Sequence, residues 1–432
     1  MLVNWRGKER YLWLIVPFLV LTVRGADWPQ WRGPERNGHA GANEQAIGEL
    51  PSDSKTVWKV ITGPGLASPV VQGKVLIQFD AVDGKETLHA LERATGKEIW
   101  RTPIDQTFHD MQGPDGPRCT PMIDGDRVYA VSCRGQLQCL SLKDGHPIWE
   151  TNYTDFGAVF IGEKGNAPGA SRHGNNGTPL IVGDRLYACA GGTNGAGVVC
   201  FNKFTGAVLW KSQNDQAGFA PPVFAKLAGE QELLCFTAEG LIGLRPDNGQ
   251  LEWRVPVKTA YSRHVVAPVW YDDVVVVSSH QAGMIATKIT REGASYKAEQ
   301  AWLKKDLAMN FSSPVSEANY LYGLGPRKNF ICVEISTGKE MWSREGYVET
   351  SADRAYAGFL VIGEQVLCLT DGGMLVLFDA NPKEFIEHGS VQVCGANWCN
   401  PAYSEGQLFL RDGNKKEGNL MCIDLKGKNH RK

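Results

Sequence analysis

One pattern recurs along most of the chain and strongly limits what the chain can fold into. Its clearest copy is residues 88–100, LHALERATGKEIW, where an alternating strand leads into a tight turn and a second short strand that ends on Trp100. Gly96 supplies the positive φ that such a turn requires. A single unit of this kind cannot bury its own apolar face, so it has to stack against further copies.

Eight copies can be traced. Most open on a small residue and a proline, as at Ser68-Pro69, continue through two β-rich strands, and close on a tryptophan strand. The closing tryptophans are Trp100, Trp149, Trp210, Trp253, Trp302 and Trp342. The seventh copy has Phe385 instead, and the eighth ends at residues 422–425 without a closing strand.

The missing strand predicts how the array ends. Residues 56–60, TVWKV, form a lone tryptophan strand around Trp58 ahead of the first full copy, and they can complete the eighth unit. Periods in the forties with four short strands each are typical of a β-propeller, and ring closure hides the sheet edges. We therefore expect an all-β, eight-bladed β-propeller of four-stranded antiparallel blades over residues 56–427, closed by the N-terminal Trp strand. An open β-solenoid would have a shorter period.

The two ends of the chain are expected to lie outside the ring. Residues 1–25 combine three basic residues with the apolar run 11–23, which is typical of a secretory signal peptide. An uncleaved anchor is the alternative, although the run is shorter than the roughly 20 residues that a membrane span needs. A Trp-rich lead-in follows at 26–55, where Trp28 and Trp31 would pin the segment to a blade, and residues 428–432 form a basic tail. These features predict an exported, periplasmic or secreted monomer with no transmembrane span once the signal is removed.

Charge and cysteine content exclude some classes of function. The net charge of −2 argues against nucleic acid as a partner. Eight of the eleven cysteines fall at inward strand positions and are expected to be small buried hydrophobes. Cys394 and Cys399 are close enough in sequence to form a disulfide across a loop, which an oxidising compartment would permit. No cysteine or histidine cluster has the spacing of a zinc site, so no metal site is predicted.

The repeat resembles a known family. Residues 90–100, ALERATGKEIW, are similar to the tryptophan-docking motif of the pyrroloquinoline quinone (PQQ) repeat family. That family includes the quinoprotein alcohol dehydrogenases and the propeller lipoprotein of the outer-membrane β-barrel assembly machine. Residues 27–34 and Arg118-Cys119-Thr120-Pro121 resemble PQQ-like secreted proteins of planctomycete-type bacteria. The resemblance implies a structural docking role for Trp58, Trp100, Trp149, Trp210, Trp253, Trp302 and Trp342, and such a packing motif says little about function.

A binding site is expected where the chain enters the first strand of each blade. In a propeller these segments surround one funnel near the axis, and glycine, asparagine, arginine and histidine gathered there would suit a polar or anionic ligand or a protein partner. The candidate residues are Arg118, His173, Asn175, Asn176, Arg263, His264, Asn310, Asn397 and Trp398. The alternative is that they satisfy backbone groups and solvate the funnel. Two long adjacent connections, 102–118 and 151–177, are further candidates for a lid or a partner contact.

Three functions fit this sequence. The first is a non-catalytic binding or assembly scaffold of the cell envelope, which by resemblance would recognise another envelope protein or an extended peptide. The second is a PQQ-dependent oxidoreductase of the alcohol dehydrogenase type, with calcium. Against it, the chain has no adjacent cysteine pair, and the funnel segments contain no Asp or Glu, although Asp110, Asp115 and Asp353 lie just outside them. The third is a carbohydrate- or small-ligand-binding propeller that uses Trp28, Trp31 and Trp398 as stacking platforms. The sequence favours the scaffold without a cofactor and identifies no catalytic residue.

Overall fold

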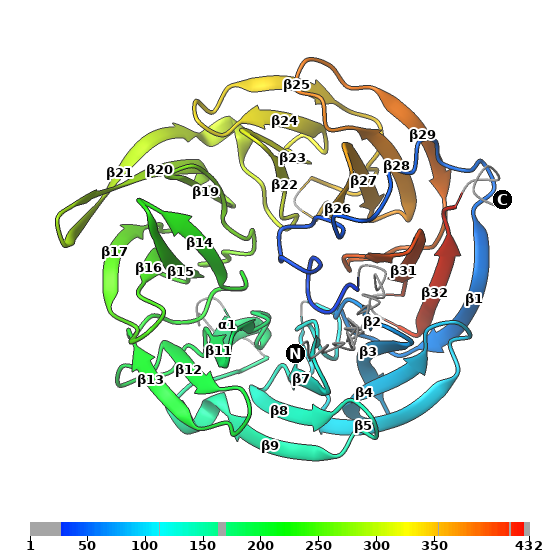
Figure 1. The fold of residues 1–432 in the computed structure, drawn as a ribbon, viewed down its shortest axis with the longest axis horizontal. Helices are drawn as coiled ribbons and strands as arrows, with labels where there is room; N and C mark the ends of the chain where they lie inside the picture. The colour runs from blue at the N-terminus through cyan, green and yellow to red at the C-terminus, as the bar shows by residue number, and fades with distance from the viewer. Residues whose placement is uncertain (1–26, 112, 163–169, 353, 414–415, 427–432) are drawn as a thin grey trace, which may run out of the picture.

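The structure, a computed structural model, is a closed ring of eight small sheets around a central axis (Figure 1). It describes residues 27–426 apart from 112, 163–169, 353 and 414–415, and leaves the side chains of 170 and 171 undescribed. The predicted signal peptide and basic tail therefore lie outside the described residues. Among the described residues, no helix has the length and apolar character of a membrane-spanning segment.

Each sheet has four antiparallel strands, which in seven of the eight sheets follow sequence order from the axis outward. Blades 1 to 4 comprise β2 (Val70–Gln72), β3 (Val75–Val82), β4 (Lys85–Glu92), β5 (Glu98–Gln106); β6 (Met122–Asp124), β7 (Arg127–Val131), β8 (Gln136–Ser141), β9 (Pro147–Asn152); β10 (Leu180–Val182), β11 (Arg185–Ala188), β12 (Val198–Asn202), β13 (Val208–Ser212); β14 (Val223–Leu227), β15 (Glu230–Thr237), β16 (Gly240–Leu244) and β17 (Leu251–Pro256).

Blades 5 to 8 continue around the ring, and three short helices lie in the connections between blades. The strands are β18 (Val269–Tyr271), β19 (Val274–Ser279), β20 (Gly283–Glu292), β21 (Ser295–Lys304); β22 (Val315–Glu317), β23 (Tyr320–Leu324), β24 (Phe330–Glu334), β25 (Glu340–Arg344); β26 (Ala357–Ile362), β27 (Gln365–Thr370), β28 (Met374–Asp379), β29 (Glu387–Gln392); β30 (Ala402–Ser404), β31 (Gln407–Arg411), β32 (Gly418–Asp424) and β1 (Lys55–Thr62). The helices are η1 (Tyr153–Phe156), α1 (Ala170–His173) and η2 (Lys305–Leu307).

Ring closure occurs as the sequence predicts. Strand β1 pairs antiparallel with β32, with Trp58 opposite Cys422, so the N-terminal strand is the outer strand of blade 8. The middle strands are buried on both faces because the blades stack against each other, and β27 is buried along its whole length. Outer strands such as β5 alternate between exposed and half-buried positions. The prediction of an eight-bladed propeller is therefore confirmed.

Tryptophan side chains connect successive blades. In six of them the indole Nε1 donates a hydrogen bond of 2.8–3.0 Å to a backbone carbonyl of the next blade; these are Trp58, Trp100, Trp149, Trp210, Trp302 and Trp342. For five of them the indole lies against a positive-φ glycine in the receiving turn. A Cβ added to Gly96 would lie 2.7 Å from the Trp58 ring, and one on Gly145 would lie 2.5 Å from Trp100. Glycine is therefore needed both for the turn and for the approach of the indole.

The seam between blades 4 and 5 is different. Trp253 donates to Glu232 Oε2 within its own blade rather than to blade 5. The outer hairpin of blade 5 is longer, because β20 and β21 have ten residues each, and a Cβ on Gly293 in its turn would meet nothing within 4 Å. The indole thus has no glycine platform at this seam, and burial raises the pKa of the Glu232 carboxyl to about 7.

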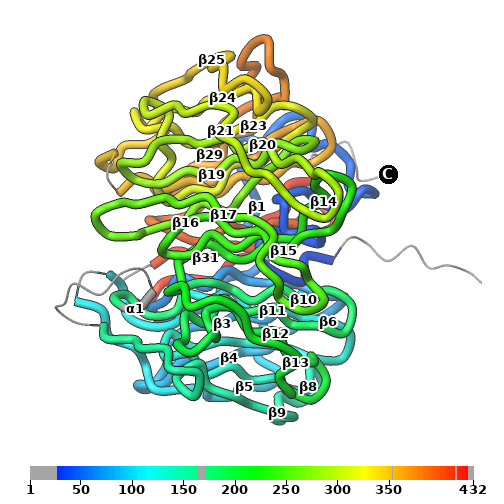
Figure 2. Tube along the Cα trace, turned by 90° about the vertical axis from the view of Figure 1, so that its left-hand side faces the viewer, coloured from blue at the N-terminus to red at the C-terminus, as the bar shows by residue number. Residues whose placement is uncertain are grey.

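The lead-in segment closes the channel instead of attaching to a single blade. In Figure 1 its dark-blue trace crosses the middle of the ring before running outward to β1, and in Figure 2 it lies on the side opposite α1. Trp28 is 1% exposed and pairs with Val71 of blade 1. Arg36 donates to the carbonyls of Thr178 and Pro179 in blade 3, and Arg32 donates to the carbonyl of Pro314 in blade 6.

The cysteines are all free thiols in the structure, and all but Cys394 are buried. The candidate bridge between Cys394 and Cys399 is not formed. The Cys394 thiol instead donates to the carbonyl of Gly395 at 3.3 Å, while Cys399 is buried in the inner wall.

We predict that two substitutions of Trp149 separate the stability contributed by its hydrogen bond from the stability contributed by its packing. Trp149→Phe should cost about 1 kcal/mol of unfolding free energy, because it removes only the hydrogen bond to the Lys203 carbonyl. Trp149→Ala should cost about 3 kcal/mol, because it also empties the space over Gly206. Urea unfolding measures both values. The exposed neighbour Ile148 is the control, and Ile148→Ala should change stability by no more than about 0.5 kcal/mol. Equal losses for all three variants would contradict a docking role.

Candidate functional site

A funnel of about 1340 Å³ opens along the ring axis. Its walls are the segments that lead into the inner strands, as the sequence predicts. Six of the nine candidate residues line it, namely Arg118, His173, Asn176, Arg263, Asn310 and Trp398. They come from five different connections, so residues far apart in sequence share one cavity.

The other three candidates were wrongly placed in the funnel, because each is fully buried behind its wall. Asn175 donates to Cys119 Sγ, and Asn397 donates to the carbonyl of Thr370. His264 stacks on Phe236 with ring centroids 4.3 Å apart, and burial lowers its pKa to about 4. The sequence shows that these segments reach the funnel, but the direction of each side chain depends on backbone geometry.

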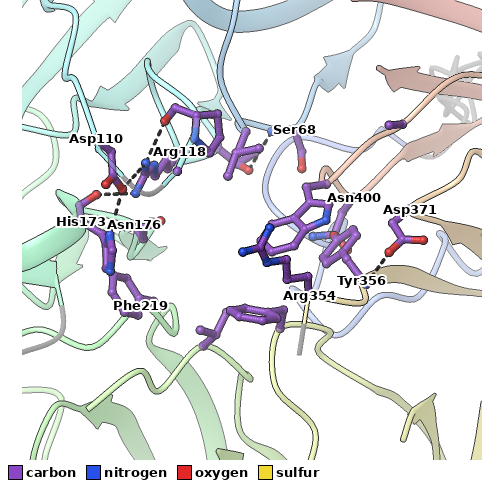
Figure 3. A pocket seen from close by; sticks show the side chains of 18 of the residues that line it. Ser68, Asp110, Arg118, His173, Asn176, Phe219, Arg354, Tyr356, Asp371 and Asn400 are labelled. Carbon is purple, nitrogen blue, oxygen red and sulfur yellow. Dashed lines mark hydrogen bonds and ion pairs between the residues drawn. The ribbon is translucent and has the colours of Figure 1, made fainter. Parts of the chain in front are cut away.

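A buried carboxylate organises one wall. Asp110 Oδ2 accepts from Arg118 Nη2 at 2.8 Å and lies 2.9 Å from His173 Nδ1, so it joins the two long connections (Figure 3). The Asp110 and Arg118 side chains are only 3% and 6% exposed. Residue spacing had placed Asp110 just outside the funnel, whereas it lies in the lining.

The opposite wall is aromatic. Trp398 lies against Phe311 and Tyr356, with ring centroids 5.1 and 5.9 Å apart. The Arg263 guanidinium lies over both Phe311 and the exposed ring of Tyr261. These contacts fix flat rings beside a cation, an arrangement that can bind aromatic or other ring-shaped groups.

Carboxylates also line this side, which corrects the expectation of an acid-free funnel. Asp371, Asp412 and Glu417 are part of the lining and come from hairpin turns that the sequence reading had not included. Asp371 Oδ2 accepts from the backbone N–H of Tyr356, and burial raises the pKa of this carboxyl. Figure 3 shows Arg354, Tyr356, Asp371 and Asn400 across the open space from Asp110 and His173.

The floor is formed by the lead-in. Trp31 lines the funnel, and the guanidinium carbons of Arg32 and Arg36 lie 5.3 and 5.8 Å from its ring centroid. Both arginines are buried, and burial lowers their pKa values to about 10 and 9. The funnel is thus closed at one end by a flat aromatic side chain with two buried cations beside it.

The rim carries an exposed apolar patch on the two long connections. Met111, Val159 and Ile161 are 64%, 57% and 43% exposed, and Tyr261 is 49% exposed on a neighbouring segment. The Met111 N–H donates to the Gly162 carbonyl, so the two connections are joined at this point. We call Met111, Val159, Ile161 and Tyr261 the rim patch. Exposed apolar side chains gathered at a cavity mouth are typical of a protein contact.

The resemblance to the dehydrogenases implies calcium and PQQ in the funnel, so the lining residues would have to be able to hold them. Within the described part of the chain, no group of three or more His, Cys, Asp or Glu side chains is arranged to hold a metal ion. Asp110 is already bound to Arg118 and His173. The two cysteines nearest this wall, Cys119 and Cys133, are buried and separated in sequence. These residues do not fit a calcium–quinone site.

The sequence of this chain is similar to those of known proteins. The sequence model of a family of PQQ-type repeats, described as "Outer membrane protein assembly factor BamB", matches residues 45–166 and 170–344. The BamB of Yersinia pestis is 21% identical over 334 residues, covering 71% of this chain and 75% of the relative. That of Moranella endobia (strain PCIT) is 22% identical and covers 61% and 62%.

Solved structures agree on the fold. BamB from Moraxella catarrhalis superposes with a TM-score of 0.58 at 13% identity, covering 86% of this chain and all of that chain. The quinohemoprotein alcohol dehydrogenase ADHIIG from Pseudomonas putida HK5 gives 0.62 at 11% identity, covering 93% and 81%. Because a propeller dehydrogenase and an assembly factor superpose about equally well, these similarities support the fold and do not choose between the functions.

We predict that Glu86 makes the funnel wall sensitive to pH. This fully buried carboxylate accepts from the backbone N–H groups of Phe108 and Cys133, and burial raises its pKa from 4.5 to about 7. The folded state therefore holds a proton that the unfolded state has lost, and stability should fall as the pH rises from 4.5 to 7. Urea unfolding at several pH values should show a smaller fall for Glu86→Gln. The exposed Glu384→Gln variant should follow the wild type, and identical profiles for all three would contradict this assignment.

Proposed function

Since the chain belongs to the outer membrane protein assembly factor BamB family of PQQ-type repeat propellers, we propose that it is a non-catalytic binding scaffold of the bacterial cell envelope. Its role would be in the assembly of outer-membrane proteins, as the names of its relatives state for them. The family match over residues 45–166 and 170–344 is the observation that carries this proposal. The proposal includes export to the periplasm, with residues 1–25 as the proposed signal peptide.

The rim patch is the proposed contact for an envelope protein or an extended peptide. It combines aliphatic side chains with Tyr261, which is flanked by the guanidiniums of Arg172 and Arg263. Tyrosine and arginine are the residue types that most often anchor protein interfaces. Because the Met111–Gly162 backbone hydrogen bond joins the two connections that carry the rim patch, less conformational entropy is lost on binding.

A scaffold without a cofactor is also part of the proposal. Its support is that the described residues contain no group of three or more His, Cys, Asp or Glu arranged to hold a metal ion, and that Asp110 is used to fix Arg118 and His173. A rigid polar wall of this kind can hold a binding surface in place without taking part in chemistry.

We predict that charge on the rim patch abolishes partner binding. The wild-type mature chain, immobilised and incubated with solubilised outer-membrane extract, should retain outer-membrane β-barrel proteins or their assembly factors. The double variant Met111→Asp/Ile161→Asp should lose them, because it places two carboxylates in the apolar contact. Ile61→Asp is the matched control, since Ile61 is 78% exposed on the outer strand β1. Retention of the same proteins by the rim variant would refute the rim patch as the contact.

We further predict that PQQ does not bind. A ligand at 100 times its dissociation constant stabilises the folded state by about 2.7 kcal/mol, which a thermal shift assay detects readily. The melting temperature of the purified mature chain should be the same with PQQ, with calcium and with both together. A calcium-dependent rise with PQQ would contradict the absence of a cofactor and would favour the oxidoreductase.

A further inference from the structure

The bottom of the funnel is surrounded by hydroxyl groups. Thr120, Thr178 and Ser313 line the cavity at the start of three inner strands. Each hydroxyl oxygen accepts a hydrogen bond from a backbone N–H of the preceding blade. The N–H of Ser68 donates to Thr120 at 3.2 Å, that of Thr120 donates to Thr178 at 2.9 Å, and that of Ala267 donates to Ser313 at 3.0 Å. Because the oxygen is fixed as an acceptor, the hydroxyl proton can be donated to a ligand. We call Thr120, Thr178 and Ser313 the hydroxyl belt.

The walls above the hydroxyl belt carry both signs of charge. Arg263 and Arg354 contribute guanidiniums, while Asp371, Asp412 and Glu417 contribute carboxylates. Amide groups of Asn176, Asn310 and Asn400 lie between them. An anionic ligand would have to approach three carboxylates, and a cationic ligand would have to approach the guanidiniums. A neutral ligand that offers many donors and acceptors can pair with all of these groups.

The flat aromatic side chains at the closed end of the funnel favour a ligand with a flat face. Trp31 presents a flat apolar surface at the closed end, and Trp398, Phe311 and Tyr356 continue flat surfaces up one wall. Since the lead-in closes the channel, an extended chain cannot pass through the ring. A ring-shaped group with one apolar face and a polar edge fits this geometry, because the face stacks on the indole while the edge reaches the hydroxyl belt.

We propose that the funnel binds a neutral oligosaccharide whose terminal sugar ring stacks on Trp31 and receives hydrogen bonds from the hydroxyl belt. The volume of about 1340 Å³ exceeds the roughly 300–1,000 Å³ of ordinary small-molecule pockets, so further sugar units extend toward the mouth. This site goes beyond the proposed scaffold function: the protein partner contacts the rim patch, and the glycan fills the funnel.

The test is a calorimetric titration of the full mature chain with three neutral tetrasaccharides, namely maltotetraose, cellotetraose and tetra-N-acetylchitotetraose, and with tetragalacturonate as an anionic counterpart. At least one neutral sugar should bind with a dissociation constant of about 1 mM or tighter. Trp31→Ala should weaken that binding about tenfold or more, and Trp31→Phe should restore most of it, because a flat ring remains. Tetragalacturonate should bind more weakly than the best neutral sugar.

A matched pair of serines separates binding from folding. Ser313→Ala and Ser312→Ala each remove one hydroxyl that accepts a backbone N–H across a blade seam, from Ala267 and Ala357 respectively. Ser313 lines the funnel, whereas Ser312 is buried behind it. Only Ser313→Ala should weaken sugar binding, although both variants should lose similar stability.

Three results would overturn the proposal. These are no binding of any neutral tetrasaccharide, tighter binding of tetragalacturonate than of every neutral sugar, and equal weakening by Ser312→Ala and Ser313→Ala. Each is independent of the scaffold function, because capture of envelope proteins depends on Met111 and Ile161 rather than on Trp31. Failure of the wild-type chain to capture any envelope protein, with sugar binding intact, would instead refute the scaffold function alone.

Discussion

The ring depends on the contact between an indole and a positive-φ glycine in the neighbouring blade. At this contact the tryptophan covers the turn and donates Nε1 to a carbonyl there, so five of the eight seams are held by one hydrogen bond and one large apolar surface. Trp58 makes the same contact with Arg93 at the joint between blades 8 and 1. Closure of the ring therefore uses the same interaction as its interior seams. The seam after Trp253 differs, since the turn glycine of blade 5, Gly293, has no indole against it and Trp253 donates to Glu232 instead.

A closed ring leaves an axial channel, and the lead-in occupies one end of it. Arg32 and Arg36 are buried by this arrangement, which lowers their pKa values because the charged guanidiniums lose water. Carbonyls at the small-Pro steps of different blades replace that water. The same residues bring Trp31 to the floor, so a single segment both bridges the blades and turns an open channel into a blind funnel.

The funnel and its rim differ in chemistry, and this difference organises the functional argument. The interior holds fixed polar groups of both signs beside flat rings, with Asp110 tying one wall together. The rim carries exposed aliphatic side chains beside Tyr261. An apolar rim suits a protein surface, and a mixed polar interior suits a small neutral ligand. Two kinds of ligand can therefore be bound by one ring, with Met111 shared between the rim patch and the funnel lining.

The sequence by itself determined the fold, the number of blades and the closure by Trp58, because these follow from local patterns that repeat at a fixed period. It also located the connections that form the funnel, and it identified Arg118, His173 and Trp398 in its lining. Tertiary structure alone decided which neighbouring side chain faces inward: Asn176 does, whereas Asn175 is buried. It also brought in Asp110 and Trp31, which the sequence had placed elsewhere, and Asp371, which the sequence analysis had not named. The physical reason is that a repeat encodes blade-to-blade packing, whereas side-chain direction near the axis depends on irregular loops and on a segment from the chain's own beginning.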